Sequence, residues 1–303
     1  MRIVSLLPSA TEIVAALGLQ DSLVGITHSC DYPPRLRACC VTSTVIPNGA
    51  DSREIDRIVK EHARHGRPLY HLDVRRIEEL DPELVLTQAV CDVCAVSESQ
   101  ASSAVGGLSI EPEIVSLHPH RFADVLADIL SVGRAAGVPD RAADLVARSR
   151  RRIERVQTRV AGLERVRTVV LEWLEPLFSA GHWTPDIVAM AGGENLLSRP
   201  GDRSRELTWG EVRTADPDFL VLACCGLDED RTMADVGYLL SQPGFQHMKA
   251  ARAGRVFVAD GGAHFSRPGP RLIDSLELLA ETLHPSGKPG ARGLERVRGL
   301  GSL

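Results

Sequence analysis

Two cysteines separated by two residues, Cys91 and Cys94, stand in the stretch LVLTQAVCDVCAVS at residues 84–97. A CxxC pair can ligate a soft metal ion or act as a redox dithiol. A zinc site would need a second CxxC or an HxxxH pair at suitable spacing to complete a tetrahedron, and neither is found. A thioredoxin-like pair would open a helix, whereas this one follows an apolar run in a loop of small residues. Three interpretations remain: lining of a ligand site, thiol ligation of a bound metal centre, and packing of small apolar thiols.

The other cysteines give weaker signals. Cys224 and Cys225 directly follow the apolar run FLVLA, and we expect one of them in the core and the other either there or at a ligand site. Cys39 and Cys40 lie near a strand start, where packing is the favoured interpretation. The seven cysteines of the chain are an odd number, which favours free thiols over a disulfide set. The sequence contains no GxGxxG, GxxxxGK[ST], HExxH or GxSxG motif.

Composition excludes several partner classes. The chain has 303 residues, enough for about two domains, and a net charge of −5 at pH 7. It therefore lacks a basic field for nucleic acid or anionic membranes. The one cationic run, at residues 147–160, interleaves arginines with Ile153, Val156 and Val160 at helical spacing. We interpret it as the solvated face of a long helix. No apolar run approaches the ~20 residues of a membrane span.

Strand and helix patterns alternate along the chain, which predicts mostly parallel sheets with helices on both faces. In the first half, strands are expected at residues 2–7, 23–28 and 84–88, and helices at residues 9–18 and 73–80. Ser9 or Thr11 could cap the first helix, and Gly18 would end it. The predicted fold class is α/β, with two Rossmann-like lobes whose parallel-rich sheets are joined by a long backbone helix.

The second half repeats the first. RRIEELDPELVLTQAVC is echoed by GEVRTADPDFLVLACCG, and the Asp-Pro pairs at Asp81 and Asp216 each precede a strand that ends in cysteine. Residues 118–162 between the halves read as helix with one break at GVPD, and His118 and His120 at its start are expected at the surface. We predict lobes at residues 1–118 and 164–286, a connecting helix at 119–163 and a mobile tail at 287–303.

Ligands of open parallel sheets bind beyond the carboxyl ends of the strands, so the loops there are expected to face a cleft between the lobes. These loops are also where the His, Cys, Trp and Tyr residues gather. The candidate ligand-binding residues are Ser9, Ala10, Thr11, His28, Cys30, Tyr32, Gln88, Cys91, Cys94, Trp173, Phe178, His182, Trp183, His264, Phe265 and Arg267.

Several motifs in order, SLLPSATEIVAALGL, VGITHSCDYPP, AGGEN and RPGPRLIDSLE, resemble the cobalamin and iron-chelate substrate-binding proteins of ABC importers. The resemblance covers about residues 1–284. Within the family, the sequence is similar to a leaderless cobalamin-binding branch in which CxVCAV and GHWxP motifs recur. It implies two α/β lobes bridged by a rigid helix, and non-catalytic binding of a corrinoid such as cobalamin. Haem or a ferric chelate is the second ligand class, and a thiol-dependent corrinoid-handling enzyme using Cys91 and Cys94 is the alternative activity.

The resemblance also implies roles for individual residues. In the relatives, the loop that corresponds to His28, Cys30 and Tyr32 touches the ligand. A turn fixed by Asp31 and Pro33-Pro34 is the structural interpretation of the same residues, and the two interpretations are compatible. His264 and Phe265 match a place where aromatic residues meet the corrin, and a neutral His264 could coordinate cobalt or iron as an axial ligand.

The aromatic residues are scarce at 4%, yet Trp173, Phe178, His182 and Trp183 fall within eleven residues. A flat macrocycle is held well by such wide apolar faces. The alternative is that the tryptophans fill the core of the second lobe. Trp209, before GEV, is expected in the core or at a helix start.

Two departures from the family concern partners and location. At the positions where importer-fed relatives present acidic docking residues, this chain has Arg75 and Gly210, with Glu78 and Glu211 nearby. Docking to an ABC permease is therefore not matched, and we expect a monomer that binds a small molecule. The N-terminal stretch MRIVSLLPSATE shows no signal peptide, so the sequence predicts a cytoplasmic protein unless a leader has been removed.

Overall fold

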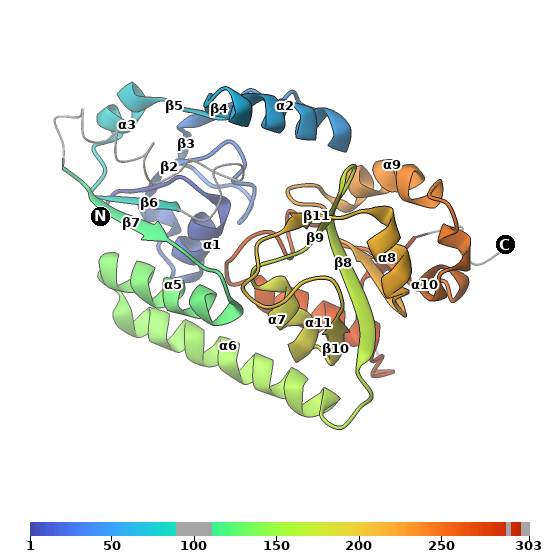
Figure 1. Cartoon of the computed structure of the whole chain (residues 1–303). Helices are drawn as coiled ribbons and strands as arrows, with labels where there is room; N and C mark the ends of the chain where they lie inside the picture. Colours follow the sequence, from blue (N-terminus) through green and yellow to red (C-terminus); the bar gives the residue numbers. More distant parts are fainter. Residues whose placement is uncertain (89–110, 289–291, 298–303) are drawn as a thin grey trace. The chain divides into compact units, whose positions relative to one another are not determined.

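The computed structural model describes residues 1–88, 111–288 and 292–297 (Figure 1). The chain forms two compact units. Unit 1 comprises Met1–Ala50, Arg57–Pro119 and Ala123–Ser149, and unit 2 comprises Asp51–Asp56, His120–Phe122 and Arg150–Leu303. No helix of the described residues is long and apolar enough to cross a membrane.

Unit 1 is built on a five-stranded, fully parallel sheet in the order β3-β2-β1-β6-β7 (Figure 1). Its strands are β1 (Ile3–Ser5), β2 (Leu23–Ile26), β3 (Cys39–Cys40), β6 (Leu84–Gln88) and β7 (Glu113–Leu117). All five residues of β6 are buried, as a run of Leu and Val at the centre of a parallel sheet predicts. A separate antiparallel pair is formed by β4 (Thr42–Thr44) and β5 (Tyr70–Leu72).

The helices of unit 1 follow the strands in the alternating pattern. They are α1 (Pro8–Ala16), the 3-10 turn η1 (Gln20–Ser22), α3 (Val74–Leu80) and α5 (Phe122–Ala135). Two further helices, α2 (Ser52–Arg64) and α6 (Pro139–Val160), contribute residues to both units, as α5 does through Phe122. The apolar stripe Ile153, Val156 and Val160 of α6 is buried while most of its arginines are exposed, which confirms the predicted solvated face.

Unit 2 has a mixed sheet in the order β11-β9-β8-β12-β13-β14, with β10 paired to β8. Its strands are β8 (Val166–Leu174), β9 (Leu177–Ser179), β10 (Gly193–Asn195), β11 (Arg205–Glu206), β12 (Phe219–Leu222), β13 (Val256–Val258) and β14 (Glu295–Arg296). Strand β12 pairs in parallel with β8 on one side and with β13 on the other, and β10 pairs in parallel with β8. The outer strands β9, β11 and β14 pair antiparallel.

The helices of unit 2 are α7 (Thr184–Met190), α8 (Trp209–Ala215), α9 (Glu229–Leu240), the 3-10 turn η2 (Phe245–His247), α10 (Lys249–Arg252) and α11 (Leu272–Leu283). Helix α11 packs against α7 and forms ion pairs with the C-terminal half of α6. Arg152 lies 2.5 Å from Asp274 and 2.6 Å from Glu277, and Arg159 pairs with Glu281. Two arginines of the cationic run are therefore structural ion-pair partners.

The predicted duplication is visible in the local backbone. Asp81 ends α3 and Asp216 ends α8, each in the left-handed region, at φ 46° and 39°. In each unit the following proline leads into a buried strand that pairs on both sides, β6 or β12. These agreements, together with the parallel-rich sheets, confirm the predicted fold class of two α/β lobes.

Two local predictions are wrong. Helix α1 begins at Pro8 with Leu7 as its N-cap and has no side-chain cap, so neither Ser9 nor Thr11 caps it. Proline is favoured in the first turn because its fixed φ suits a helix and its missing N–H would be unpaired there. Cys39 and Cys40 do form a strand, but both are exposed because β3 is a two-residue edge strand. They do not pack in the core.

Candidate functional site

Each sheet has one place where a ligand site is expected from topology. In unit 1, β1 and β6 are neighbours at the middle of the sheet. The chain continues from β1 to β2 on one side of this pair and from β6 to β7 on the other side. In unit 2, β8 and β12 are the corresponding neighbours, since β9 lies beyond β8 and β13 beyond β12. A crevice forms beyond the carboxyl ends of strands where the connections diverge. The predicted site loops follow these strands or their neighbours.

In unit 1, a row of hydroxyl and thiol groups lies beyond β1. The Thr11 hydroxyl donates to the Ser5 hydroxyl at 2.8 Å and lies 3.1 Å from the Cys30 sulfur, which is also 3.3 Å from the Thr27 hydroxyl. The side chains of Ser9, Ala10 and Thr11 are fully buried. These three residues therefore lie on the buried face of α1. In this row of hydroxyl and thiol groups, Cys30 is the residue that is only half-buried.

His28 is held in one orientation. Its Nδ1 lies 2.7 Å from the Thr42 hydroxyl, its backbone N–H donates to the same oxygen at 3.1 Å, and its ring lies 5.8 Å from that of Tyr70. Partial burial lowers the pKa of His28, which favours the neutral imidazole. A hydrogen bond at Nδ1 leaves Nε2 as the nitrogen available for a ligand. Thr42 and Tyr70, which position this ring, had no signal in the sequence.

The remaining residues of unit 1 are placed differently. Tyr32 is 44% exposed, in the loop after β2, and Gln88 is buried at the end of β6. Cys91 and Cys94 lie outside the described residues, so the three interpretations of the CxxC pair stay open.

In unit 2, Trp173 and Phe178 face each other across the β8–β9 hairpin. Both are half-buried, and Trp173 packs partly against the core of the unit. This pair offers apolar ring surface at the carboxyl end of β8. Within the predicted group, Trp183 is buried, whereas this pair and His182 are half-buried.

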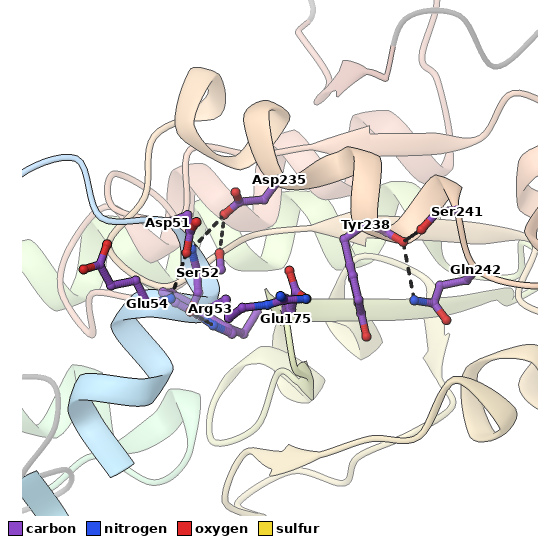
Figure 2. Close-up of polar contacts among 10 residues, drawn as sticks. Asp51, Ser52, Arg53, Glu54, Glu175, Asp235, Tyr238, Ser241 and Gln242 are labelled. Carbon is purple, nitrogen blue, oxygen red and sulfur yellow. Dashed lines mark hydrogen bonds and ion pairs between the residues drawn. The ribbon is translucent and has the colours of Figure 1, made fainter. Parts of the chain in front are cut away.

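The indole of Trp173 also holds the segment Asp51–Asp56. Its Nε1 donates to the Ser52 carbonyl at 3.2 Å, and Ser52 itself is buried. Figure 2 shows the Ser52 hydroxyl and backbone N–H directed at the Asp235 carboxylate of α9, with Arg53 beside Glu175. The N–H lies 3.3 Å from Asp235 Oδ2, and Arg53 Nε donates to Glu175 at 2.8 Å. These contacts, which the sequence did not indicate, fix the loop after β8.

Trp183 has a structural place. It is 7% exposed, and its Nε1 donates to the Phe265 carbonyl at 2.6 Å. Phe265 is itself 3% exposed at φ 65°, and its N–H donates to the Ser275 hydroxyl at 3.3 Å. The core interpretation therefore holds for Trp183, and the ring of Phe265 is buried with it. The bond between them joins the loop after β9 to the loop after β13.

The same loop after β13 carries two half-buried candidates, His264 and Arg267. The His264 N–H donates to the Asp260 carbonyl at 2.8 Å, and the Asp260 carboxylate accepts the Ala263 N–H at 2.6 Å. Within the described residues no group of three or more His, Cys, Asp or Glu side chains could hold a metal ion. An axial role of His264 toward a bound macrocycle stays a prediction.

His182 adopts a left-handed backbone at φ 52°, and its ring lies 6.1 Å from His120 and 5.6 Å from Trp183. Burial lowers the pKa of His182, and the nearby His120 and Arg203 lower it further. His120 is exposed, as predicted, and its place beside His182 is new because the two residues are distant in sequence.

The two positions aligned with docking acids are exposed. Arg75 pairs with Glu79 at 3.2 Å, and Gly210 lies in the first turn of α8. Neighbouring Glu211 is part of the capping box of α8: it accepts the Thr208 N–H at 2.8 Å and pairs with Arg205 at 2.8 Å. These hydrogen bonds lower the pKa of Glu211 to about 2. The Glu211 carboxylate, which lies next to the position of a docking acid, is therefore already paired with Thr208 and Arg205.

No disulfide joins any of the described cysteines, and they should differ widely in reactivity. Cys224 is fully buried, and burial raises its pKa to about 12, whereas Cys39 and Cys40 are exposed. The thiolate is the reactive form, so we expect iodoacetamide at pH 8 to alkylate Cys39 and Cys40 while Cys224 stays unmodified until the protein is unfolded. Peptide mass spectrometry over a time course measures this. Labelling of Cys224 at the rate of Cys39 would contradict the buried position.

Two α/β units, each with a parallel-rich sheet and candidate loops at the ends of its central strands, are the architecture of a two-lobed solute-binding protein. The chain belongs to the periplasmic binding protein family, whose model matches residues 3–262. It is 24% identical over 288 residues to the uncharacterised ABC transporter substrate-binding lipoprotein YvrC of Bacillus subtilis, covering 94% of this chain and 80% of the relative.

A second relative is the cobalamin-binding protein of Halobacterium salinarum, 23% identical over 93% of this chain and 69% of its own length. Among solved structures, a periplasmic heme-binding protein from Pseudomonas aeruginosa superposes with a TM-score of 0.71 at 23% identity, covering 97% of both chains. At this identity the structural likeness shows the fold.

These relatives overturn the predicted location. The family is one of periplasmic binding proteins, and YvrC is a lipoprotein. The cytoplasmic assignment from the N-terminal stretch is therefore wrong. A short N-terminal sequence was a weak basis for it, because the similarity to periplasmic binding proteins and to a lipoprotein extends over nearly the whole chain.

Proposed function

We propose that this chain binds a corrinoid such as cobalamin without transforming it, and serves its uptake with an ABC importer. The proposed contacts come from the loops that follow the central strands of the two sheets. The observation that carries the proposal is the cross-strand pair Trp173 and Phe178, both partly exposed at the carboxyl end of β8. Ring faces of this kind suit a wide, flat ligand.

Similarity supports the same ligand class, since the halobacterial relative that matches 93% of this chain is a cobalamin-binding protein. Membership in the periplasmic binding protein family supports the non-catalytic part of the proposal. The thiol-dependent enzyme remains the alternative activity, and it depends on Cys91 and Cys94.

Haem is the second candidate ligand, and His28 is the observation in its favour. Its imidazole is favoured in the neutral form, and its Nδ1 is occupied by Thr42 at 2.7 Å, so Nε2 could ligate iron. The exposed phenol of Tyr32 lies four residues further along the chain. The same imidazole could ligate cobalt, so His28 bears on how the metal is held in either macrocycle.

An absorbance titration of the purified protein with hydroxocobalamin, repeated with haemin, tests the proposal. We expect saturation at one cobalamin per chain, and weaker binding of haemin. A shifted cobalamin spectrum that is lost in His28→Ala would assign the axial ligand to His28. If the shift persists in that variant and disappears in His264→Ala, the ligand is His264.

The opposite results are equally clear. Tight haemin binding with no cobalamin binding would replace the corrinoid by haem. Binding of neither, together with rapid thiol chemistry at Cys91 or Cys94 on added corrinoid, would favour the enzyme. Stoichiometric cobalamin binding that survives Cys→Ser changes at both positions would exclude it.

A further inference from the structure

A small polar corner of unit 2 is formed by His120, His182 and Arg203, and the proposed function assigns it no part of the ligand. Two loops supply His182 and Arg203, residues 180–183 between β9 and α7 and residues 199–204 before β11, and His120 comes from the segment before α5. The His182 N–H donates to the Asp202 carbonyl at 2.6 Å, and the Gly201 N–H donates to the His182 carbonyl at 3.0 Å. The backbone of His182 is thereby fixed against the second loop.

Gly181 allows the two loops to touch. A Cβ atom at this position would lie 2.5 Å from both the Asp202 carbonyl oxygen and the Ser204 nitrogen, so only glycine fits. The left-handed φ of His182, uncommon for a residue with a side chain, is held by the same pair of backbone hydrogen bonds. The imidazole is thus positioned by the fold.

The protonation of His182 can be inferred from its surroundings. Its Nδ1 is buried and has no hydrogen-bond partner among the described residues. An N–H at that atom would be a buried unpaired donor, which costs roughly 1–3 kcal/mol. With the proton on Nε2 the buried Nδ1 is an unpaired acceptor instead of a donor, and the pKa lowered by burial, His120 and Arg203 favours the neutral imidazole. In this tautomer His182 can donate a hydrogen bond through Nε2.

The charges around the imidazole leave a positive surplus. Arg121 is neutralised by Asp186, with hydrogen bonds of 2.9 and 2.7 Å, and Asp202 Oδ2 accepts the Arg199 N–H at 3.0 Å. The exposed Arg203 guanidinium takes part in no ion pair within the described part of the chain. With the Arg121–Asp186 pair cancelled, the loop at residues 199–204 has two arginines, Arg199 and Arg203, against one aspartate, Asp202.

This arrangement disfavours a metal ion. A histidine that ligates through Nε2 normally donates its Nδ1–H to a carbonyl or carboxylate, and His182 has no such partner in the described structure. The neighbouring guanidinium would also repel a cation. An oxygen anion suits both features, because it accepts from an Nε2–H and pairs with arginine.

We propose that His182 and Arg203, with His120 beside them, bind an anionic oxygen group of the ligand: the phosphodiester of the cobalamin nucleotide loop, or a propionate if the ligand is haem. This inference rests on the proposed function and adds which part of the macrocycle unit 2 recognises. The ring faces give contact area, and this corner gives selectivity for a charged side group.

Affinity for cobalamin and for cobinamide, which lacks the nucleotide loop and its phosphate, tests the inference. We expect Arg203→Gln to weaken cobalamin binding about tenfold and to leave cobinamide binding unchanged, since one charge-assisted hydrogen bond contributes roughly 1.5 kcal/mol or more. His182→Asn, which tolerates a left-handed backbone, should act in the same direction. Arg199→Gln is the matched control, because it removes the same charge from the same loop.

The arms of the experiment separate the possible results. If wild-type protein binds cobinamide as tightly as cobalamin, the inference is wrong while the proposed function stands. Equal losses for both ligands in Arg203→Gln would also overturn it. If haemin is the ligand, its dimethyl ester replaces cobinamide, and a loss confined to the free acid supports the corner as a propionate site. A wild-type protein that binds neither macrocycle refutes the proposed function and the inference with it.

Discussion

Gly261→Ala is expected to destabilise unit 2 by about 3 kcal/mol or more, near the upper end of what overpacking costs. A Cβ atom at residue 261 would lie 1.9 Å from the Cys224 carbonyl oxygen and 2.6 Å from its carbon. Both are backbone atoms just beyond β12, so no side-chain rotation relieves the clash. The loop after β13 would have to move away from the end of β12.

The measurement is urea denaturation followed by tryptophan fluorescence. All three tryptophans, Trp173, Trp183 and Trp209, belong to unit 2, so the signal reports that unit. Gly262→Ala is the matched control: the nearest atom to its added methyl group is a side-chain oxygen of Asp260 at 3.4 Å, an ordinary contact. A Gly261→Ala protein as stable as the Gly262→Ala protein would contradict the close packing of this loop.

Gly261→Ala should also disturb the candidate site, because it is expected to displace Phe265, whose carbonyl accepts the hydrogen bond from Trp183. Phe265 lies four residues after Gly261, and its carbonyl receives the indole N–H at 2.6 Å. Displacement of the loop would break this buried bond, which leaves an unpaired indole donor. A ligand-affinity loss is therefore expected to accompany the stability loss in Gly261→Ala.

The fold was predictable because its signals are local. The Asp-Pro pairs at Asp81 and Asp216 predicted equivalent units, and the structure gives both aspartates a left-handed conformation at a helix end. Aspartate tolerates that conformation and proline cannot continue the helix, so two adjacent residues determine the turn. The apolar runs before Gln88 and Ala223 likewise identified the buried strands β6 and β12.

The failed local predictions depend on competition between neighbours. Pro8 starts α1 one residue before the serine that could cap it, and the Thr11 hydroxyl bonds to Ser5 instead. Cys39 and Cys40 have the composition of a packed strand, but their exposure depends on β3 lying at the sheet edge. Strand order is a tertiary property that an apolar pattern does not contain.

The candidate site was predictable only as a set of loops. Strand ends can be found from the sequence, and they correctly placed Trp173, His182 and His264 in loops or at strand ends of unit 2. Which side chain is buried depends on partners distant in the chain. His120 lies 62 residues from His182, and Ser52 is 121 residues from Trp173, so no motif could join them.

Asp128 in α5 is the second position where a large effect is expected. One of its carboxylate oxygens is buried with no hydrogen-bond partner in the described structure. Burial, with repulsion from Asp124 one turn earlier, raises the pKa of Asp128 to about 7. An unfolded aspartic acid has a pKa of about 3.9, so the folded state holds the proton over a pH range in which the unfolded state has released it.

The sign of the pH dependence follows from this difference. The contribution of Asp128 to stability is fully present below about pH 4, falls as the pH rises toward 7, and stays lost above that value. Asp128→Asn removes the ionisation but keeps the shape. We expect it to change little at pH 4.5 and to stabilise the protein by about 2 kcal/mol at pH 8, roughly half of what the full shift would allow.

Urea denaturation followed by far-ultraviolet circular dichroism at pH 4.5, 6 and 8 measures the effect, since unit 1 contains no tryptophan. Asp144→Asn on α6 removes the same charge from an exposed position and should show no such trend. The comparison between these two variants cancels the pH dependence of the other carboxylates. A gain from Asp128→Asn that is the same at all three pH values would arise from packing or net charge, and would refute a buried carboxyl group that resists ionisation.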